Sequence, residues 1–157
     1  MEEYIEFETA KLAKEIGFNV PTRNLYEYAL TTQIDPETND STGAFGWKEG
    51  ECKLVDQFMI NNHKDVDFSN TAWYICSAPT QAVLERWLRE VHRINVIVSF
   101  KPNIKKWDFM PYSMNMDGKE YAKYYKEYYK QHNDRRYDTY ELALEDGLVE
   151  ALNLINI

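Results

Sequence analysis

The sequence predicts an α+β protein, with helices packed on one face of a largely antiparallel sheet of about five strands. Four segments place apolar residues at helical spacing, and five others are rich in the β-branched and aromatic residues typical of strands. The chain has 157 residues and shows no repeat, low-complexity tract or linker. We therefore expect residues 1–157 to form a single α+β domain in the order helix, three strands, helix, two strands and two helices.

The first helix is expected at about Glu6–Ile16, because apolar residues recur there on one face. Gly17 follows at the position where a left-handed residue closes a helix, and Phe18 occupies the site of the accompanying hydrophobic contact. Three strands are then expected at 24–34, 52–60 and 71–77. The polar, glycine-containing segment 35–46 is predicted to be a loop.

The second helix is expected to begin near Ser77, with Pro79 in its first turn and Ser77 or Thr80 as the cap. Its apolar stripe consists of Val83, Leu84, Trp87, Leu88 and Val91. Two i,i+4 ion pairs are expected on its outer face, Glu85–Arg89 and Arg86–Glu90. The following segments, 94–100 and 106–114, are expected to pair as a hairpin across 101–105. Pro111 predicts that the second of these strands lies at an edge or a bulge.

The third helix begins at "DGKE", where Asp117 and Glu120 have the spacing of a capping box. Five tyrosines then recur on one helical face: Tyr121, Tyr124, Tyr125, Tyr128 and Tyr129. In the C-terminal helix, Asp138 and Glu141 repeat the capping spacing. Its apolar stripe consists of Leu144, Leu148, Ala151, Leu152 and Ile155.

Composition narrows the classes of function. A formal net charge of −8 disfavours a general nucleic-acid binder, because neutralising phosphates requires a basic surface. No apolar run approaches the ~20 residues that cross a bilayer, and the acidic start is unlike a signal peptide. The two cysteines, Cys52 and Cys76, form no disulfide framework. We expect a soluble cytoplasmic protein that has no membrane partner.

Three segments, "FETAKLAKEIGF", "APTQAVLERWLREVH" and "TYELALEDGLVEALNLI", resemble in this order a family of small uncharacterised proteins encoded by phages and prophages. They cover the first, second and last expected helices. The resemblance implies an intracellular role in a bacterial host during infection or lysogeny. It brings no known activity, substrate or catalytic residue with it.

Motifs for chemistry are sparse. The sequence contains no G-x-S-x-G, G-x-G-x-x-G or Walker A motif, so we assign no catalytic residue and no cofactor. His63, Asp65 and Asp67 alternate and would share one face of a strand as weak metal ligands, although a polar surface loop explains them equally well. Arg86, Arg89 and Arg93 form either an anion-binding ridge or the solvated side of the second helix.

The tyrosine-rich helix is the most unusual feature. Its five tyrosines either pack on the sheet with their hydroxyls at the rim, or form a surface that binds a partner, since tyrosine is enriched in binding hot spots. We predict a non-catalytic binding or interaction module that uses this surface for a protein or a small ligand. The alternatives are a small hydrolase that combines carboxylates with His63 or His92, and a single-stranded nucleic-acid accessory protein. The oligomeric state is left open.

Overall fold

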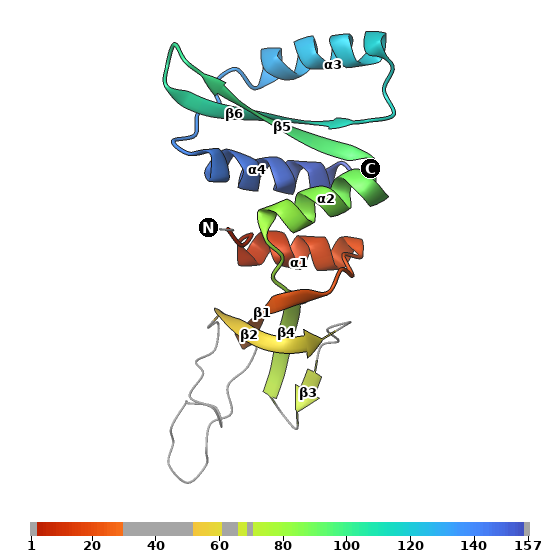
Figure 1. Ribbon diagram of the computed structural model, residues 1–157, viewed down its shortest axis with the longest axis vertical. Coiled ribbons are helices and arrows are strands. Elements are labelled where there is room, and N and C mark those ends of the chain that lie inside the picture. Colours follow the sequence, from red (N-terminus) through yellow and green to blue (C-terminus); the bar gives the residue numbers. More distant parts are fainter. Residues whose placement is uncertain (1–2, 30–51, 61–65, 69–70, 156–157) are drawn as a thin grey trace. The chain divides into compact units, whose positions relative to one another are not determined.

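The computed structural model describes residues 3–29, 52–60, 66–68 and 71–155 (Figure 1). The chain divides into two compact units. The N-terminal unit, Glu6–Pro79, contains α1 (Phe7–Ile16), β1 (Thr22–Ala29), β2 (Cys52–Ile60), β3 (Val66–Phe68) and β4 (Thr71–Ser77). The hairpin unit, Met1–Ile5 with Thr80–Ile157, contains α2 (Gln81–Val91), β5 (Ile94–Lys101), β6 (Lys106–Ser113), α3 (Gly118–Gln131) and α4 (Tyr140–Asn153).

The α+β class and the antiparallel pairing are confirmed. The prediction of one sheet of about five strands needs correction, because the described strands form a four-stranded sheet in the order β2-β1-β4-β3 and a separate two-stranded sheet, β5-β6. The short strand β3 was not expected. Strand pairing joins residues that are far apart in the sequence, so strand patterns alone do not assign strands to sheets. The single domain expected over residues 1–157 stays a prediction.

The N-terminal unit begins with a helix that closes as predicted. Gly17 is left-handed, with φ of 101°, and its N–H donates to the Lys14 carbonyl. The N–H of Phe18 donates to the Ala13 carbonyl, which completes the Schellman arrangement, and the Phe18 side chain is buried. Next to the sheet, the rings of Phe7 and Tyr26 meet edge to face at 5.6 Å.

In the hairpin unit, α2 begins at Gln81, two residues after Pro79, which was expected in its first turn. Thr80 is the N-cap and accepts a hydrogen bond from the Val83 N–H, so Pro79 precedes the helix instead of lying in its first turn. Leu84, Trp87 and Leu88 are buried as expected. Val91 is 60% exposed, so the apolar stripe stops before the last turn. Both predicted ion pairs are present: Arg89–Glu85 at 3.1 Å and Arg86–Glu90 at 3.8 Å.

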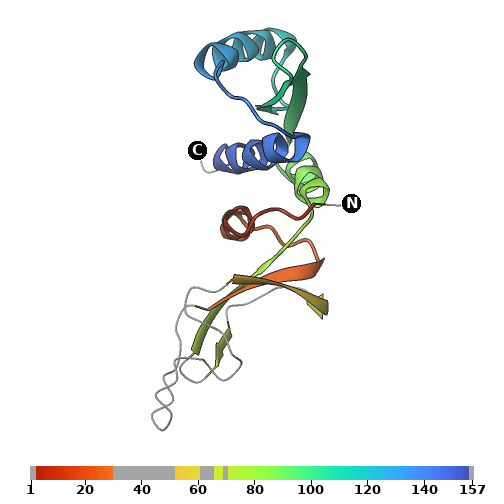
Figure 2. The same cartoon turned by 90° about the vertical axis from the view of Figure 1, so that its left-hand side faces the viewer.

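The β5–β6 hairpin is covered on both faces, not on one face as predicted. Cross-strand partners share a face and successive residues alternate, so Val96 and Phe109 point to one side and Lys101 and Tyr112 to the other. Val96 and Phe109 meet α4 at Gly147, whereas Tyr112 and Lys101 meet tyrosines of α3. Figures 1 and 2 show α3 and α4 on opposite sides of the hairpin. Four successive buried residues of β6, from Asp108 to Pro111, result from this double cover.

The outer edge of β6 has its backbone groups engaged. Trp107 exchanges both backbone hydrogen bonds with Tyr137, at 2.9 and 3.1 Å. The Phe109 N–H donates to the side chain of Asp108 at 2.8 Å. Pro111 has no N–H to satisfy, and its carbonyl accepts from the Tyr124 hydroxyl at 2.7 Å. The predicted edge position of Pro111 is therefore confirmed.

The two C-terminal helices differ in how they are capped. Asp117 and Glu120 form the predicted capping box of α3, with Asp117 accepting from the N–H groups of Lys119 and Glu120. At α4, the N-cap is Thr139, not Asp138, and its hydroxyl accepts from the Leu142 N–H. Asp138 instead pairs with Lys106. The expected stripe of α4 is buried at Leu144, Leu148, Ala151 and Leu152.

Candidate functional site

The five tyrosines of α3 separate into two rows. Tyr124 and Tyr128 form an inner row that lies along the outer edge of β6, with ring centroids 5.7 Å apart. Tyr121, Tyr125 and Tyr129 form an outer row over the hairpin face that carries Tyr112 and Lys101, away from α4. The centroids of neighbouring rings in this row are 6.3 and 4.7 Å apart. The single tyrosine face that helical periodicity predicts for α3 therefore lies partly at the edge of β6 and partly over the hairpin face.

The inner row is structural. Tyr128 is buried, and its hydroxyl accepts a hydrogen bond from Arg135 at 2.5 Å. The same guanidinium donates to Glu150 of α4 at 2.5 Å and lies 4.7 Å from the centre of the Phe109 ring. Burial raises the pKa of Tyr124 to about 12, with the Glu150 carboxylate adding to the shift. Burial likewise raises the pKa of Tyr128. These phenols are held neutral inside the packing.

The outer row is partly open to solvent. Tyr125, at its centre, is 46% exposed, while Tyr121 and Tyr129 are half-buried. Tyr112 of β6 extends the row beyond Tyr121, with ring centroids 5.1 Å apart. At the other end, the Lys101 ammonium lies 5.1 Å from the centre of the Tyr129 ring. Burial raises the pKa of Tyr121 and Tyr129. Tyrosine has an apolar ring and a polar hydroxyl, so the surface of the row is amphipathic.

The charge around the outer row is opposite to that of the whole chain. Residues 101–130 contain seven lysines and four acidic residues, whereas the chain carries −8. Two of the four acids have internal roles, since Asp108 is fully buried against Lys101 and Asp117 caps α3. Four exposed lysines lie on α3 itself: Lys119, Lys123, Lys126 and Lys130. A solvated, locally basic strip thus accompanies the tyrosines.

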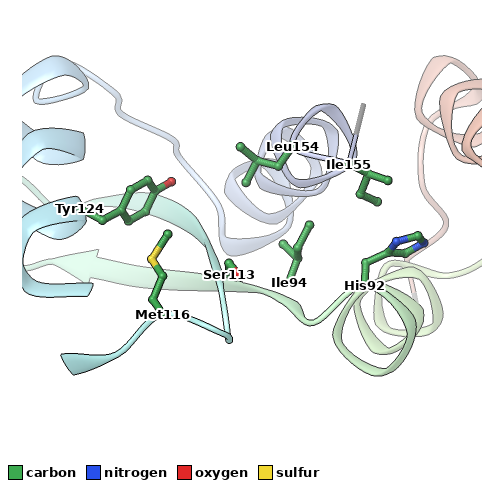
Figure 3. A pocket seen from close by; sticks show the side chains of 7 residues that line it. All are labelled: His92, Ile94, Ser113, Met116, Tyr124, Leu154 and Ile155. Carbon is green, nitrogen blue, oxygen red and sulfur yellow. The ribbon is translucent and has the colours of Figure 1, made fainter. Parts of the chain in front are cut away.

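The hairpin unit also contains a pocket of about 380 Å³. Its lining comes from the end of α2, the hairpin, α3 and the end of α4: His92, Ile94, Ser113, Met116, Tyr124, Leu154 and Ile155. In Figure 3, Tyr124 and His92 lie at opposite ends, and the four apolar side chains lie between them. The volume falls within the range of small-molecule sites, ~300–1,000 Å³.

His92 lines one end of this pocket. It is the C-cap residue of α2, and its ring packs edge to face on Trp87 at 4.5 Å. Its Nε2 is buried and has no hydrogen-bond partner among the described residues. The next residue, Arg93, has a left-handed backbone conformation with φ of 58°, which is uncommon for residues other than glycine. Buried polar atoms are normally paired, so this Nε2 requires an explanation.

The other predicted sites are only partly covered. His63 and Asp65 lie outside the described residues, and Asp67 is described only through its backbone in β3, opposite Ala72. Among the described residues, no group of three or more His, Cys, Asp or Glu side chains has a metal-binding arrangement. Arg86 and Arg89 each pair with a glutamate on α2, while Arg93 is exposed. Anion binding at these arginines stays a prediction.

Sequence reasoning missed the pocket and the role of Arg135, because both depend on how separate segments of the chain pack together. Within the described part of the chain, no helix has the length and apolar character to cross a bilayer. Comparison of the chain with protein-family models, with curated proteins and with solved structures finds no match in any of the three.

Proposed function

We propose that the chain is a non-catalytic interaction module, and that the outer tyrosine row binds an acidic segment of a partner protein. Following the resemblance stated above, it acts as a phage or prophage accessory protein in the cytoplasm of a bacterial host. The observation that carries the proposal is the half-exposed row centred on Tyr125, flanked by lysines in an otherwise acidic chain.

Two properties of the outer row favour partner binding: a low conformational cost and a charge opposite to that of an acidic partner. The outer rings are already ordered by their contacts with Tyr112 and Lys101, so binding a partner immobilises few additional side chains. Tyrosine rings bury apolar area while their hydroxyls stay hydrogen-bonded, which is why they are enriched in hot spots. The exposed lysines favour a partner of opposite charge and steer its approach.

The test places a photoreactive benzoylphenylalanine at position 125 or at position 142, in bacterial cells that express the chain. Leu142 is the matched control because it is 51% exposed and lies on α4, away from the row. We expect a discrete crosslinked protein from position 125 only. A pattern that is equal at both positions contradicts the proposal.

The crosslinked protein is then purified and its affinity measured. We expect Tyr125→Ser to weaken binding by about tenfold or more, whereas Leu142→Ser leaves it unchanged. Charge reversal at Lys123 and Lys126 together should also weaken binding, with the larger loss at low salt, because exposed charges are screened as ionic strength rises. Affinity that is unchanged in Tyr125→Ser rules out this surface.

A second candidate is a single-stranded nucleic-acid platform, because bases stack on exposed aromatic side chains beside lysines, and the exposed Tyr125 lies between the exposed Lys123 and Lys126 on α3. Fluorescence anisotropy with an oligothymidine separates the two. Tight oligothymidine binding that weakens steeply with salt, and is lost in Tyr125→Ser, would show that the row binds a nucleic acid and not a protein. The hydrolase alternative with His92 gains no support from its pocket, which has no carboxylate among its seven lining residues, and His63 lies outside the described residues.

A further inference from the structure

We propose that the acidic partner segment is an amphipathic α-helix that packs along α3, an inference that rests on the function proposed above. The feature that points to a helix is a line of residues on the surface of α3, the α3 seam. It consists of Gly118, Ala122, Tyr125 and Tyr129, which recur at steps of four, three and four residues. This is the a/d spacing through which two helices pack along each other.

The α3 seam lies on the open side of the helix. Gly118, Ala122 and Tyr125 are exposed, and Tyr129 is half-buried. A Cβ added at Gly118 would meet no atom within 4 Å, so a partner side chain can approach the start of the seam closely. Figures 1 and 2 show α3 at the outside of the hairpin unit, with the hairpin on one side of it. A second helix can therefore lie against α3 without displacing a described element of this unit.

The spacing along the α3 seam distinguishes a helical segment from an extended one. Steps of four and three residues correspond to about 6 and 4.5 Å along α3, because an α-helix rises about 1.5 Å per residue. A partner helix presents its side chains at the same alternating intervals, over about three turns. In an extended segment, side chains on one face recur at a constant ~6.6 Å, so they lose register with the seam over its length.

Unpaired lysines beside the α3 seam determine the charge of the partner. They recur with the same steps of four, three and four residues, and all four are exposed: Lys119, Lys123, Lys126 and Lys130. None of them forms an ion pair with another described residue. Lys119 and Lys126 directly follow seam residues and so occupy e positions, which pair with charged residues of a partner helix. Aspartate or glutamate on the partner would pair with them. A second copy of α3 is disfavoured, because it would bring two sets of lysines together.

The probe is a synthetic peptide of three heptads with leucine at a and d and glutamate at e and g, the glutamate peptide. Its binding to the full chain is measured by fluorescence anisotropy, and we expect saturable binding with Kd below ~100 µM. Two companion peptides should bind at least about tenfold more weakly. One has prolines at two solvent-facing positions, which prevent the helix and keep the seam-facing residues. The other has lysine in place of every glutamate.

The variant that tests the α3 seam is Ala122→Glu. It places a carboxylate in the seam, and it should weaken binding of the glutamate peptide at least about tenfold, through like charge and lost packing. The matched control is Gln131→Glu, which adds the same charge at an exposed position of α3 that lies off the seam. The control should change the affinity by less than about twofold, because exposed charges at a distance are screened. Both positions are exposed, so neither change disturbs the core.

The natural partner is tested in cells with benzoylphenylalanine on two sides of α3. Position 122, in the α3 seam, should crosslink the same protein as position 125, whereas the exposed position 127, on the opposite side of the helix, should not. The helical partner is overturned by equal affinity of the glutamate peptide and either companion peptide, by no saturable binding of the glutamate peptide, by unchanged binding in Ala122→Glu, or by no crosslink from position 122. The crosslink from position 125 decides the proposed function separately. If it is discrete while these tests fail, the outer row binds a protein segment that is not helical.

Discussion

The guanidinium of Arg135 and the carboxylate of Glu150 lie 2.5 Å apart, and they join the segment after α3 to α4. Arg135 also donates to the Tyr128 hydroxyl, so a single nitrogen connects a tyrosine of α3, the connecting segment and α4. Both charged side chains are about a quarter exposed. This half-buried ion pair, the Arg135–Glu150 tie, links α3, which carries the outer tyrosine row, to α4.

The first prediction concerns this tie. Glu150→Gln removes the charge that Arg135 pairs with, and we expect a loss of about 1–2 kcal/mol in the free energy of unfolding. The matched control is Glu90→Gln, which breaks the Arg86–Glu90 pair, whose side chains are about two-thirds exposed. The control should change stability by less than about 0.5 kcal/mol. Urea denaturation measures both, and equal losses would contradict a special role for Arg135.

The second prediction concerns Gly147. A Cβ at this position would lie 2.6 Å from Val96 Cγ1 and 3.2 Å from the Phe109 ring. Gly147→Ala should therefore destabilise the protein by about 1–3 kcal/mol, although alanine is favoured in a helix by about 1 kcal/mol. Gly118→Ala is the control, since no atom lies within 4 Å of its added Cβ. Thermal unfolding compares them, and a stabilising Gly147→Ala would contradict this packing of α4.

The third prediction concerns alkaline pH. Because burial raises the pKa of Tyr124 from 10.0 to about 12, folding favours its neutral form. This contribution to stability is complete below pH 10 and disappears as the pH rises through 12. Tyr124→Phe should lose stability less steeply over this interval, while the raised pKa values of Tyr128 and Tyr137 leave part of the slope. Urea denaturation across the interval provides the slopes, and identical slopes would contradict the assignment.

The fourth prediction concerns Asp108, which is fully buried on the α3 side of the hairpin. Its Oδ1 accepts from the Phe109 N–H, and its other oxygen pairs with Lys101. Asp108→Asn leaves the lysine, whose side chain is 31% exposed, without its partner, so we expect a loss of about 1–2 kcal/mol. The double variant with Lys101→Met should recover part of that loss. A double-mutant cycle with no coupling would show that the pair contributes nothing.

Local signals in the sequence predicted the helices well. The capping box of Asp117 and Glu120 and the closure at Gly17 require only neighbouring residues, so the sequence contains everything they need. The cap of α4 shows the limit of such signals. Asp138 and Thr139 both have a capping side chain at suitable spacing, and the choice depends on Lys106, which is distant in sequence and takes Asp138 as its partner.

Only part of the candidate site was predicted, because the rest depends on contacts that are distant in sequence. Periodicity places five tyrosines on one face of α3, but it does not reveal that α3 lies over the hairpin with one row of rings along the edge of β6. That edge separates Tyr124 and Tyr128 from Tyr125. The pocket was invisible to the sequence, because its seven lining residues come from segments as far apart as His92 and Ile155.

The closed outer edge of β6 has a consequence for self-association. An exposed strand edge offers unpaired backbone groups to another chain and is a common starting point for domain swapping and fibril growth. Here the backbone N–H and C=O of Trp107 are hydrogen-bonded to Tyr137, and the N–H of Phe109 donates to the Asp108 side chain. Pro111 has no N–H. An incoming strand finds no run of free donors along this side, so the hairpin is protected against polymerisation through β6.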